Sequence, residues 1–404
     1  MRDFTESSQL HEWMFSSVEE LEKCRAKANQ QAREYLAKPP DVQEASKASL
    51  AFSAPVYTAA KGYSKRQKKA PDTEDPTTAG PWKNAKEHPF ITPNEEALLV
   101  AFYTSKVPML IGPLAQVPRL RRESKVTATA SMLLKRFFLS NSVMLHDPKA
   151  VMVAACFCAT KIEDATADVR YLEDGTNLMN APVSQAEILP AELALLEGIS
   201  FQLLCFHPFK PVVALTEDLR SFLKSEKGLP LVDNRHIAGE DLKPMYDAAR
   251  AALDDIIVSD LPFLYTPGQL GLAAMIVANE DLNAKRKEKQ RDGSNEEDDD
   301  DDDGVGLPNL DLLAYIRLRF SDERGHELEA AMKELVPMIR ELKEGKHGCA
   351  NQNVDMTELK NVHKRLKKCR GWGKKDNDKK DKKSKKRSKE DGGDDEPKKK
   401  KAKS

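Results

Sequence analysis

The sequence is poor in the residue types that mark disulfide-bonded, metal-binding or sheet-rich proteins. It has six cysteines in 404 residues, none of them in C-x-x-C spacing, and only 6% aromatic residues. This cysteine usage argues against a disulfide framework and a zinc ribbon, and it implies a reducing compartment. The low aromatic content, together with 32% charged residues, favours helices with solvated faces over sheets.

Catalytic motifs are also missing from the sequence. It contains no Gly-rich phosphate loop, no nucleophile elbow, no H-E-x-x-H and no kinase catalytic set. We therefore expect no enzymatic activity of the chain itself, no cofactor and no metal. The first residues, MRDFTESSQL, lack an apolar core, and no segment approaches the about 18 uncharged apolar residues that cross a bilayer. We expect a soluble intracellular protein that binds no membrane.

The formal net charge of -1 conceals an acidic run at 296–303 and a Lys-rich tail at 374–403. Because the tail lacks aromatic residues and an apolar period, it is predicted to be disordered and to act through charge. Its compact basic clusters indicate nuclear import. The import candidates are Lys382, Lys383, Lys385, Lys386, Arg387, Lys398, Lys399, Lys400 and Lys401. Weak contact with nucleic-acid phosphates is a second interpretation, and a solubilising tail is a third.

Periodicity and capping signals predict an all-α chain with two tandem helical bundles. Capping-box spacings occur at Thr92/Glu95 and Ser184/Glu187, and the run AVMVAACFCAT at 150–160 is apolar on every side, as in the central helix of a bundle. Each terminal helix has one thin apolar stripe and is expected to dock as an appendage. The predicted segments are an N-terminal helix (1–38), a disordered linker (39–88), a first bundle (89–206), a second bundle (207–346) with an acidic disordered insertion (284–307), a C-terminal helix (347–372) and a disordered basic tail (373–404).

Two blocks of the sequence resemble the centre and the end of a cyclin box. They are KRFFLSNSVMLHDPKAVMVAACFCATKIED at 135–164 and LPAELALLEGISFQLLCFHPFKP at 189–211. TPGQLGLAAM at 266–275 resembles the matching helix of a second cyclin fold. WMFSSVEELEKCRAKAN at 13–29 and ELKNVHKRLKKC at 358–369 are similar to the flanking segments of the cyclin H group. The resemblance implies two tandem cyclin folds flanked by terminal helices.

The resemblance also implies partners and a site. A cyclin of this group binds and activates the catalytic subunit of a cyclin-dependent kinase, with a RING-type assembly factor and the TFIIH core as further partners. Lys161 and Glu192 match the Lys and Glu that cyclins present to the mobile helix of the kinase. Trp13 and Phe15 match a segment that helps a helix to pack on the box and to contact the kinase. Nuclear localisation, transcription and cell-cycle control are the implied setting.

Two other kinds of protein share parts of this pattern. Another transcriptional cyclin, of the C or L type, would share the boxes but not the terminal helices. A TFIIB-like factor with tandem cyclin folds would bind promoter DNA, but that family has an N-terminal zinc ribbon, where this chain has only Cys24. Cys156 and Cys158 are expected to be buried packing residues, because two residues apart on a helix they face different directions. His363 with Cys349 and Cys369 is a similarly weak ligand set.

Overall fold

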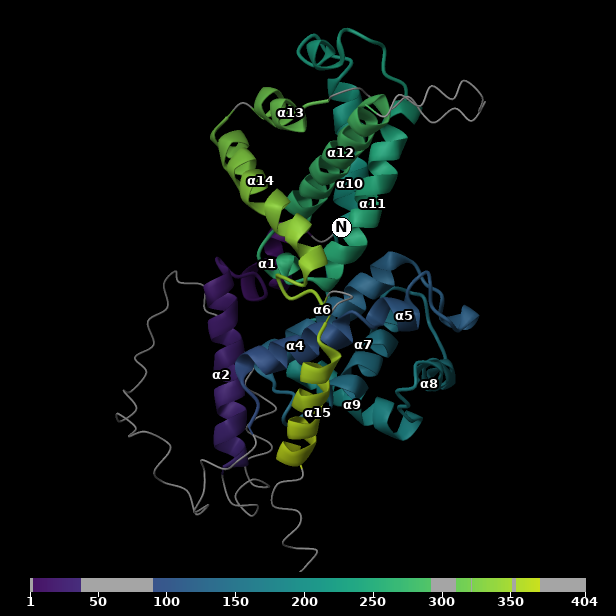
Figure 1. Ribbon diagram of the computed structural model, residues 1–404, viewed down its shortest axis with the longest axis vertical. Helices are drawn as coiled ribbons and strands as arrows, with labels where there is room; N and C mark the ends of the chain where they lie inside the picture. Colours follow the sequence, from purple (N-terminus) through teal and green to yellow (C-terminus); the bar gives the residue numbers. More distant parts are fainter. Residues whose placement is uncertain (1–2, 38–89, 292–309, 321, 351–353, 371–404) are drawn as a thin grey trace, which may run out of the picture.

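The protein is described here by a computed structural model, which is drawn in Figure 1. The described residues are 3–37, 90–291, 310–320, 322–350 and 354–370. Within them the chain forms helices and connecting loops but no strand, so the predicted all-α class is confirmed. Two helical bundles lie end to end along the long axis. The predicted linker 39–88 and basic tail 373–404, with all the import candidates, lie outside the described residues.

The first bundle is built around α7. Its helices are α4 (Pro93–Thr104), α5 (Val107–Ile111), α6 (Ser124–Ser140), α7 (Pro148–Ile162), α8 (Val169–Leu178) and α9 (Gln185–Gly198). All five of the other helices contact α7, and residues 151–156 and 158–160 of α7 are buried. The apolar run is thus surrounded by other helices, which confirms the prediction of a central helix.

Both predicted capping boxes form at the starts of helices in this bundle. The backbone N–H of Thr92 donates to Glu95 Oε2 at 2.9 Å, and the backbone N–H of Ser184 donates to Glu187 Oε2 at 2.9 Å. In each case the hydroxyl side chain accepts the N–H of the glutamate in return. Each box therefore satisfies donors that the first turn of a helix leaves without an intrahelical partner.

The second bundle is centred on α12, which contacts α10, α11 and α14. Its helices are α10 (Phe209–Phe222), α11 (Lys243–Val258), α12 (Pro267–Arg291), α13 (Leu312–Arg319) and α14 (Glu323–Glu341). The structure differs from the predicted insertion 284–307 at its start, because α12 continues to Arg291. The sequence AKRKE at 284–288 consists of strong helix formers, and its cations interact favourably with the negative end of the helix dipole. The rest of that insertion, from 292 onward, is not described.

Short 3-10 helices precede α1 or lie in the connections between the longer helices. They are η1 (Phe4–Glu6), η3 (Pro118–Leu120), η4 (Leu229–Val232), η5 (Glu240–Leu242), η6 (Leu261–Phe263) and η7 (Leu342–Glu344).

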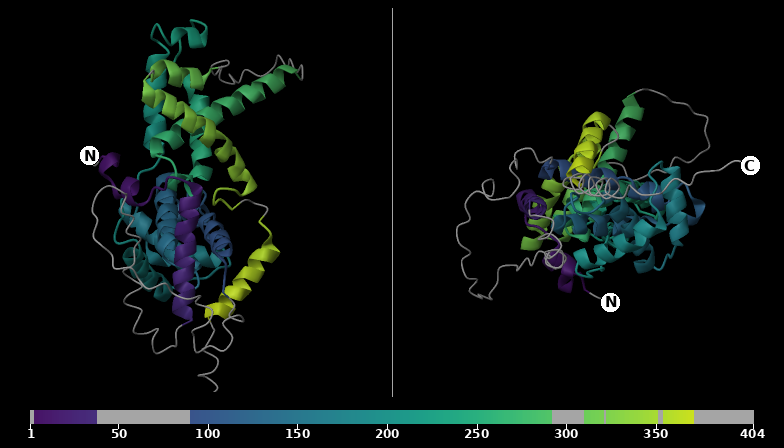
Figure 2. Two further views of the ribbon diagram at one scale, coloured as in Figure 1. Left: turned by 90° about the vertical axis from the view of Figure 1, so that its left-hand side faces the viewer. Right: turned by 90° about the horizontal axis from the view of Figure 1, so that it is seen from below.

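Helices from both ends of the described chain pack on the first bundle (Figure 2). They are α1 (Ser8–Glu12), α2 (Val18–Leu36) and α15 (Met356–Arg370). Leu21 of α2 is 1% exposed and Leu366 of α15 is 4% exposed, and both belong to the hydrophobic core of that bundle. The thin apolar stripes of the two terminal helices are therefore buried in the core of the first bundle. The division into segments stays a prediction, and these contacts favour counting both terminal helices with the first bundle.

A buried cluster of charges joins the two bundles. Asp260, which follows α11, accepts hydrogen bonds from Arg25 of α2 at 2.7 Å and from Lys135 of α6 at 2.9 Å. Lys135 also donates to the carbonyl of Gly348 at 3.0 Å. Burial alone would raise the pKa of Asp260, but the two cations hold it well below its usual value, while burial lowers the pKa of Lys135. Gly348 has a φ of 69°, and a Cβ there would lie 2.0 Å from a carboxylate oxygen of Asp260, so only glycine fits.

We call these four residues the junction cluster. It connects α2, α6, the end of α11 and the loop that leads to α15, and it thereby fixes both terminal helices relative to the two bundles.

Candidate functional site

Lys161 and Glu192, which the resemblance predicts to bind a kinase, lie together on the surface of the first bundle. Lys161 is in the last turn of α7 and Glu192 is on α9. Their side chains form an ion pair, with 45% of the Lys161 side chain and 12% of the Glu192 side chain exposed. The Lys161 ammonium also lies 4.1 Å from the centre of the Phe157 ring, a cation–π contact that orients it. The pair is accessible, and its two partners come from different helices.

Two exposed leucines on α9 extend this site. Leu189 is 52% exposed and Leu193 is 56% exposed. Glu192 and Leu193 lie three and four residues after Leu189, which is about one helical turn. The three side chains therefore share one region of the helix surface. We call Lys161, Glu192, Leu189 and Leu193 the α7–α9 face. These leucines are not among the residues predicted from the sequence, although α9 has more apolar residues than one buried stripe requires.

The chemistry beside this face does not favour catalysis. Burial, followed by the nearby Glu192 carboxylate, raises the pKa of the Cys158 thiol to about 11. Cys158 is 3% exposed and Cys156 is fully buried, in line with the packing role predicted for both. A thiol that stays protonated at neutral pH is a poor nucleophile. The arrangement is suited to binding a surface that offers hydrogen-bonding and apolar groups together.

Trp13 and Phe15 are buried rather than displayed. Trp13 is 3% exposed and Phe15 is 5% exposed. The backbone N–H of Phe15 donates to the carbonyl of Phe263 at 2.7 Å, and the two rings meet edge to face at 6.4 Å. The structure therefore places both aromatics in packing of the N-terminal segment. Their contact with a kinase stays a prediction, and little of either side chain is left for a partner to touch.

Arg136 is the residue that holds this segment in place, and the sequence analysis did not single it out. It is 0% exposed, and its guanidinium carbon lies 5.4 Å from the centre of the Trp13 ring. It donates to the carbonyls of Gln202 and Leu204 at 3.1 Å each and to Gln9 Oε1 at 3.3 Å. These partners follow α9 or lie on α1, so a single buried cation joins the N-terminal segment to the end of the helix that carries Glu192.

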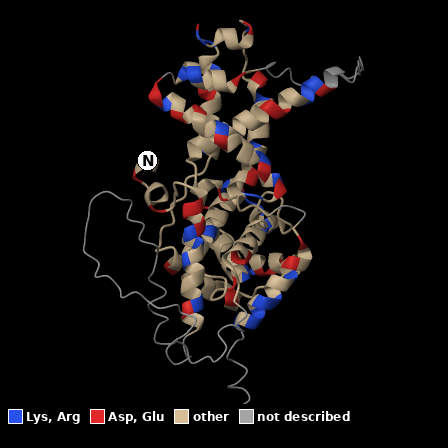
Figure 3. Cartoon of the chain, turned by 60° about the vertical axis from the view of Figure 1, so that its left-hand side comes forward, with Lys and Arg blue, Asp and Glu red and all other residues tan. Residues whose placement is uncertain are grey.

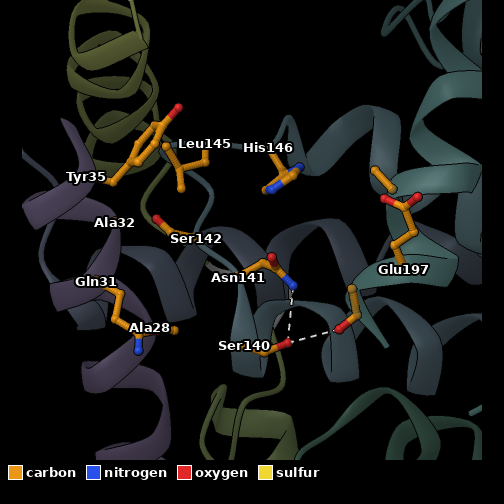
Figure 4. Close-up of a pocket in the computed structure, with 12 residues that line it drawn as sticks. Ala28, Gln31, Ala32, Tyr35, Ser140, Asn141, Ser142, Leu145, His146 and Glu197 are labelled. Carbon is orange, nitrogen blue, oxygen red and sulfur yellow. Dashed lines mark hydrogen bonds between the residues drawn. The ribbon is translucent and has the colours of Figure 1, made fainter. Parts of the chain in front are cut away.

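A cavity of about 280 Å³ lies on the other side of α9, against α2 and the loop between α6 and α7 (Figure 4). Its polar groups are partly engaged with one another: Asn141 donates to Ser140 Oγ at 3.1 Å, and Ser140 donates to the carbonyl of Gly198 at 3.2 Å. Burial, followed by the charge of Arg370, lowers the pKa of His146 to about 4, so its ring is neutral at neutral pH. Ser142, which also lines the cavity, donates to the buried carboxylate of Glu96.

The described residues contain neither a metal-binding cluster nor a membrane-spanning helix. No group of three or more His, Cys, Asp or Glu side chains lies close enough to hold a metal ion there. His363 is engaged elsewhere, with its ring nitrogens 2.9 Å from the Tyr103 hydroxyl and 2.9 Å from the Leu359 carbonyl. Among the same residues, none of the helices combines the length and the apolar character that a membrane crossing requires.

Comparison with known proteins gives a consistent result. The family profile described as the cyclin C-terminal domain matches residues 207–371. Cyclin-H1-1 of Arabidopsis thaliana is 28% identical over 279 residues, which are 69% of this chain and 71% of that protein. Cyclin CCL1 of Saccharomyces cerevisiae is 29% identical over 192 residues, or 48% of this chain and 44% of that protein. Cyclin-H of Xenopus laevis is 25% identical over 190 residues, or 46% of this chain and 53% of that protein.

The chain thus spans less than two thirds of the length of the yeast and frog relatives. Among solved structures, a chain of the CAK complex from Chaetomium thermophilum bound to ATP-gamma-S is similar, with a TM-score of 0.57 and 22% identity. That match covers 91% of this chain and 88% of the other. A likeness at this level of identity concerns the fold, and it agrees with two tandem cyclin folds flanked by helices.

Proposed function

We propose that this chain, which is similar in sequence to cyclins, is a cyclin H-like regulatory subunit that binds and activates a cyclin-dependent kinase. The observation that carries the proposal is the α7–α9 face. On it Lys161 and Glu192, which by resemblance match the Lys and Glu that cyclins present to a kinase, form an ion pair beside two leucines that are about half exposed. Exposed apolar side chains next to a charged pair are typical of a binding surface.

The face has the groups needed to hold a helix of a kinase. Because Lys161 and Glu192 are paired, they would contact one terminus of such a helix: the ammonium of Lys161 can donate to the free carbonyls there, and the carboxylate of Glu192 can accept backbone N–H groups nearby. Full burial of Leu189 and Leu193 would contribute on the order of 1 kcal/mol each, since about half of each is already buried. The polar pair would set the orientation, and the leucines would supply apolar contact.

Activation would follow from binding by a shift of population. A protein kinase is active when a strand Lys pairs with a Glu on its mobile helix. A subunit that binds only the active position of that helix moves the equilibrium toward it, and a shift from 1:99 to 99:1 takes about 5.5 kcal/mol of differential binding. In this proposal the chain does no chemistry of its own.

The finer assignment rests on the relatives. The names of several relatives place them with cyclin H, and the titles of similar structures name the CAK complex and a yeast TFIIK complex. We therefore assign the partner as the catalytic subunit of a CDK-activating kinase, with a RING-type assembly factor and the TFIIH core. RNA polymerase II and the activation loops of other kinases would be substrates. The same assignment places the chain in the nucleus, where the import candidates of the tail would direct it.

Variants of the α7–α9 face test the proposal. Lys161→Ala and Glu192→Ala should each weaken kinase binding by about 2 to 5 kcal/mol, or about 30-fold or more, because the remaining charge would be buried without its partner. Leu189→Asp should weaken it further by placing a charge in the apolar contact. Leu318→Asp is the control, since Leu318 is 41% exposed on α13 of the second bundle.

The measurements are titration calorimetry with the kinase subunit and phosphorylation of a polymerase-tail peptide. Unchanged affinity in both charge variants would remove the α7–α9 face from the interface. Recovery of a different kinase from nuclear extract would instead favour a cyclin of the C or L type.

A further inference from the structure

The solvent-facing side of α15 carries a row of lysines that the proposed function does not use. Lys360, Lys364, Lys367 and Lys368 are all exposed, and we call them the lysine face. Because an α-helix turns by about 100° per residue, the four fall within about 100° of its circumference. Figure 3 shows blue bands of Lys and Arg along α15. The buried residues of α15, Leu359 among them, lie on the opposite side.

The cations of α15 divide into two groups with different surroundings. Arg365 forms an ion pair with Glu95, and Arg370 lies 3.6 Å from the Asp147 carboxylate and donates to the carbonyl of Val143 at 3.1 Å. Among the described residues, none of the four lysines makes an ion pair. The arginines thus attach the helix to the first bundle, and the lysine face is left with uncompensated positive charge.

Such a row is unfavourable for the helix by itself. Like charges three or four residues apart repel, and 360/364, 364/367 and 364/368 are three such pairs. The arrangement persists because the apolar side of α15 is buried in the first core. A bound polyanion would remove the repulsion, and the fixed helix would present the charges without a further loss of conformational freedom.

We infer that the lysine face is a nucleic-acid contact surface that binds phosphates without reading sequence. Lysines one turn apart are separated by about 6 Å along the helix axis, close to two base-pair steps of a DNA strand. A membrane fits less well, because surface helices insert an apolar side and that of α15 is already buried. The exposed residues of this face include no aromatic side chain that could stack on a base, so contact would be made with the backbone. The inference is independent of kinase binding.

The test uses the full chain, a fluorescent random-sequence DNA duplex and anisotropy over a series of salt concentrations. The variant replaces all four lysines of the lysine face by Gln, which preserves helix propensity. The matched control replaces four exposed lysines elsewhere, Lys210, Lys224, Lys227 and Lys243, by Gln. A third protein lacks residues 371–404. Helical content is compared by circular dichroism to confirm that each variant is folded.

The lysine-face variant should bind DNA at least about tenfold more weakly at low salt. The slope of its plot of log K against log salt concentration should become less negative by about three to four. The control should retain both the affinity and the slope. The protein without residues 371–404 should still bind DNA, with lower affinity than the full chain. Binding should be lost when the four lysines of the lysine face are also replaced by Gln in that protein. Equal affinities of the lysine-face variant and the control would overturn the inference. Complete loss of binding on removal of 371–404 alone would also overturn it, since the tail would then be the whole contact surface.

Discussion

The two bundles differ in where their cores come from along the chain. The second core is made almost entirely from one continuous stretch, 209–349. The first draws on 13–32 and 359–369 as well as on its own helices, and it encloses the charges of Lys135 and Arg136. The bundle that carries the α7–α9 face is thus braced by both ends of the described chain. A binding surface gains rigidity in this way, because the helices that display it are fixed by remote segments.

The junction cluster should show the largest effect, since it links the two bundles. Asp260→Asn would keep the shape of the side chain but leave Arg25 and Lys135 without a counter-charge. Removal of one partner from a buried ion pair costs about 3 to 5 kcal/mol. Urea denaturation followed by circular dichroism should show this loss.

The matched control for that variant is Glu217→Gln, which breaks the ion pair with Arg220 on the surface of the second bundle, where both side chains are at least 40% exposed. Exposed pairs contribute at most about 1 kcal/mol. Equal denaturation midpoints for the two variants would mean that the junction cluster does not stabilise the fold.

A core substitution in α15 would show whether that helix belongs energetically to the first bundle. Leu366→Ala should destabilise the first bundle by about 2 to 4 kcal/mol, the usual range for a buried leucine. Trp13 can report on that bundle by fluorescence if Trp82 and Trp372 are replaced by Phe. Met332→Ala, in the second core, is the comparison. If Leu366→Ala left the Trp13 transition unchanged, α15 would be an appendage, as the sequence alone had suggested.

Lowering the pH should destabilise the first bundle through His146. This should be the smallest of the three losses of stability. Its pKa falls from 6.5 to about 4 on folding because burial, and then Arg370, disfavour the charged ring. The contribution of the neutral His146 ring to the stability of the fold is therefore fully present above pH 6.5, and it is lost as the pH falls toward 4. It should amount to about 1 to 2 kcal/mol by pH 5. Urea titrations at pH 7 and pH 5 measure it, and His146→Gln should lose less stability between them than the parent chain. An equal loss in both proteins would contradict this role.

Local signals in the sequence predicted the helices well. The capping boxes at Thr92 and Ser184 mark true helix starts, and the run at 150–160 is the central helix. Both depend on residues that are close in sequence, so they are visible without a structure. The end of α12 was misplaced because the acidic run that follows it obscured a stretch of good helix formers.

The site was predicted less completely. Lys161 and Glu192 are predicted through resemblance to a family and not through any local pattern, and their role stays a prediction. Arg136 and Asp260 were missed because their partners are distant: Lys135 and Asp260 are 125 residues apart. A Lys-Arg pair in a helix ordinarily indicates a solvated face, and only the folded chain shows that both side chains are buried.

The separation of Lys135 from Asp260 also has a consequence for synthesis on the ribosome. At about 5 to 20 residues per second, the carboxylate emerges roughly 6 to 25 seconds after the lysine, and α15 emerges later still. During that interval the nascent first bundle has Arg25 and Lys135 without their acceptor and lacks the helix that covers part of its core. Translation order thus delays completion of the half that carries the α7–α9 face until the other half has been made, and a prematurely terminated chain would leave the first bundle unfinished.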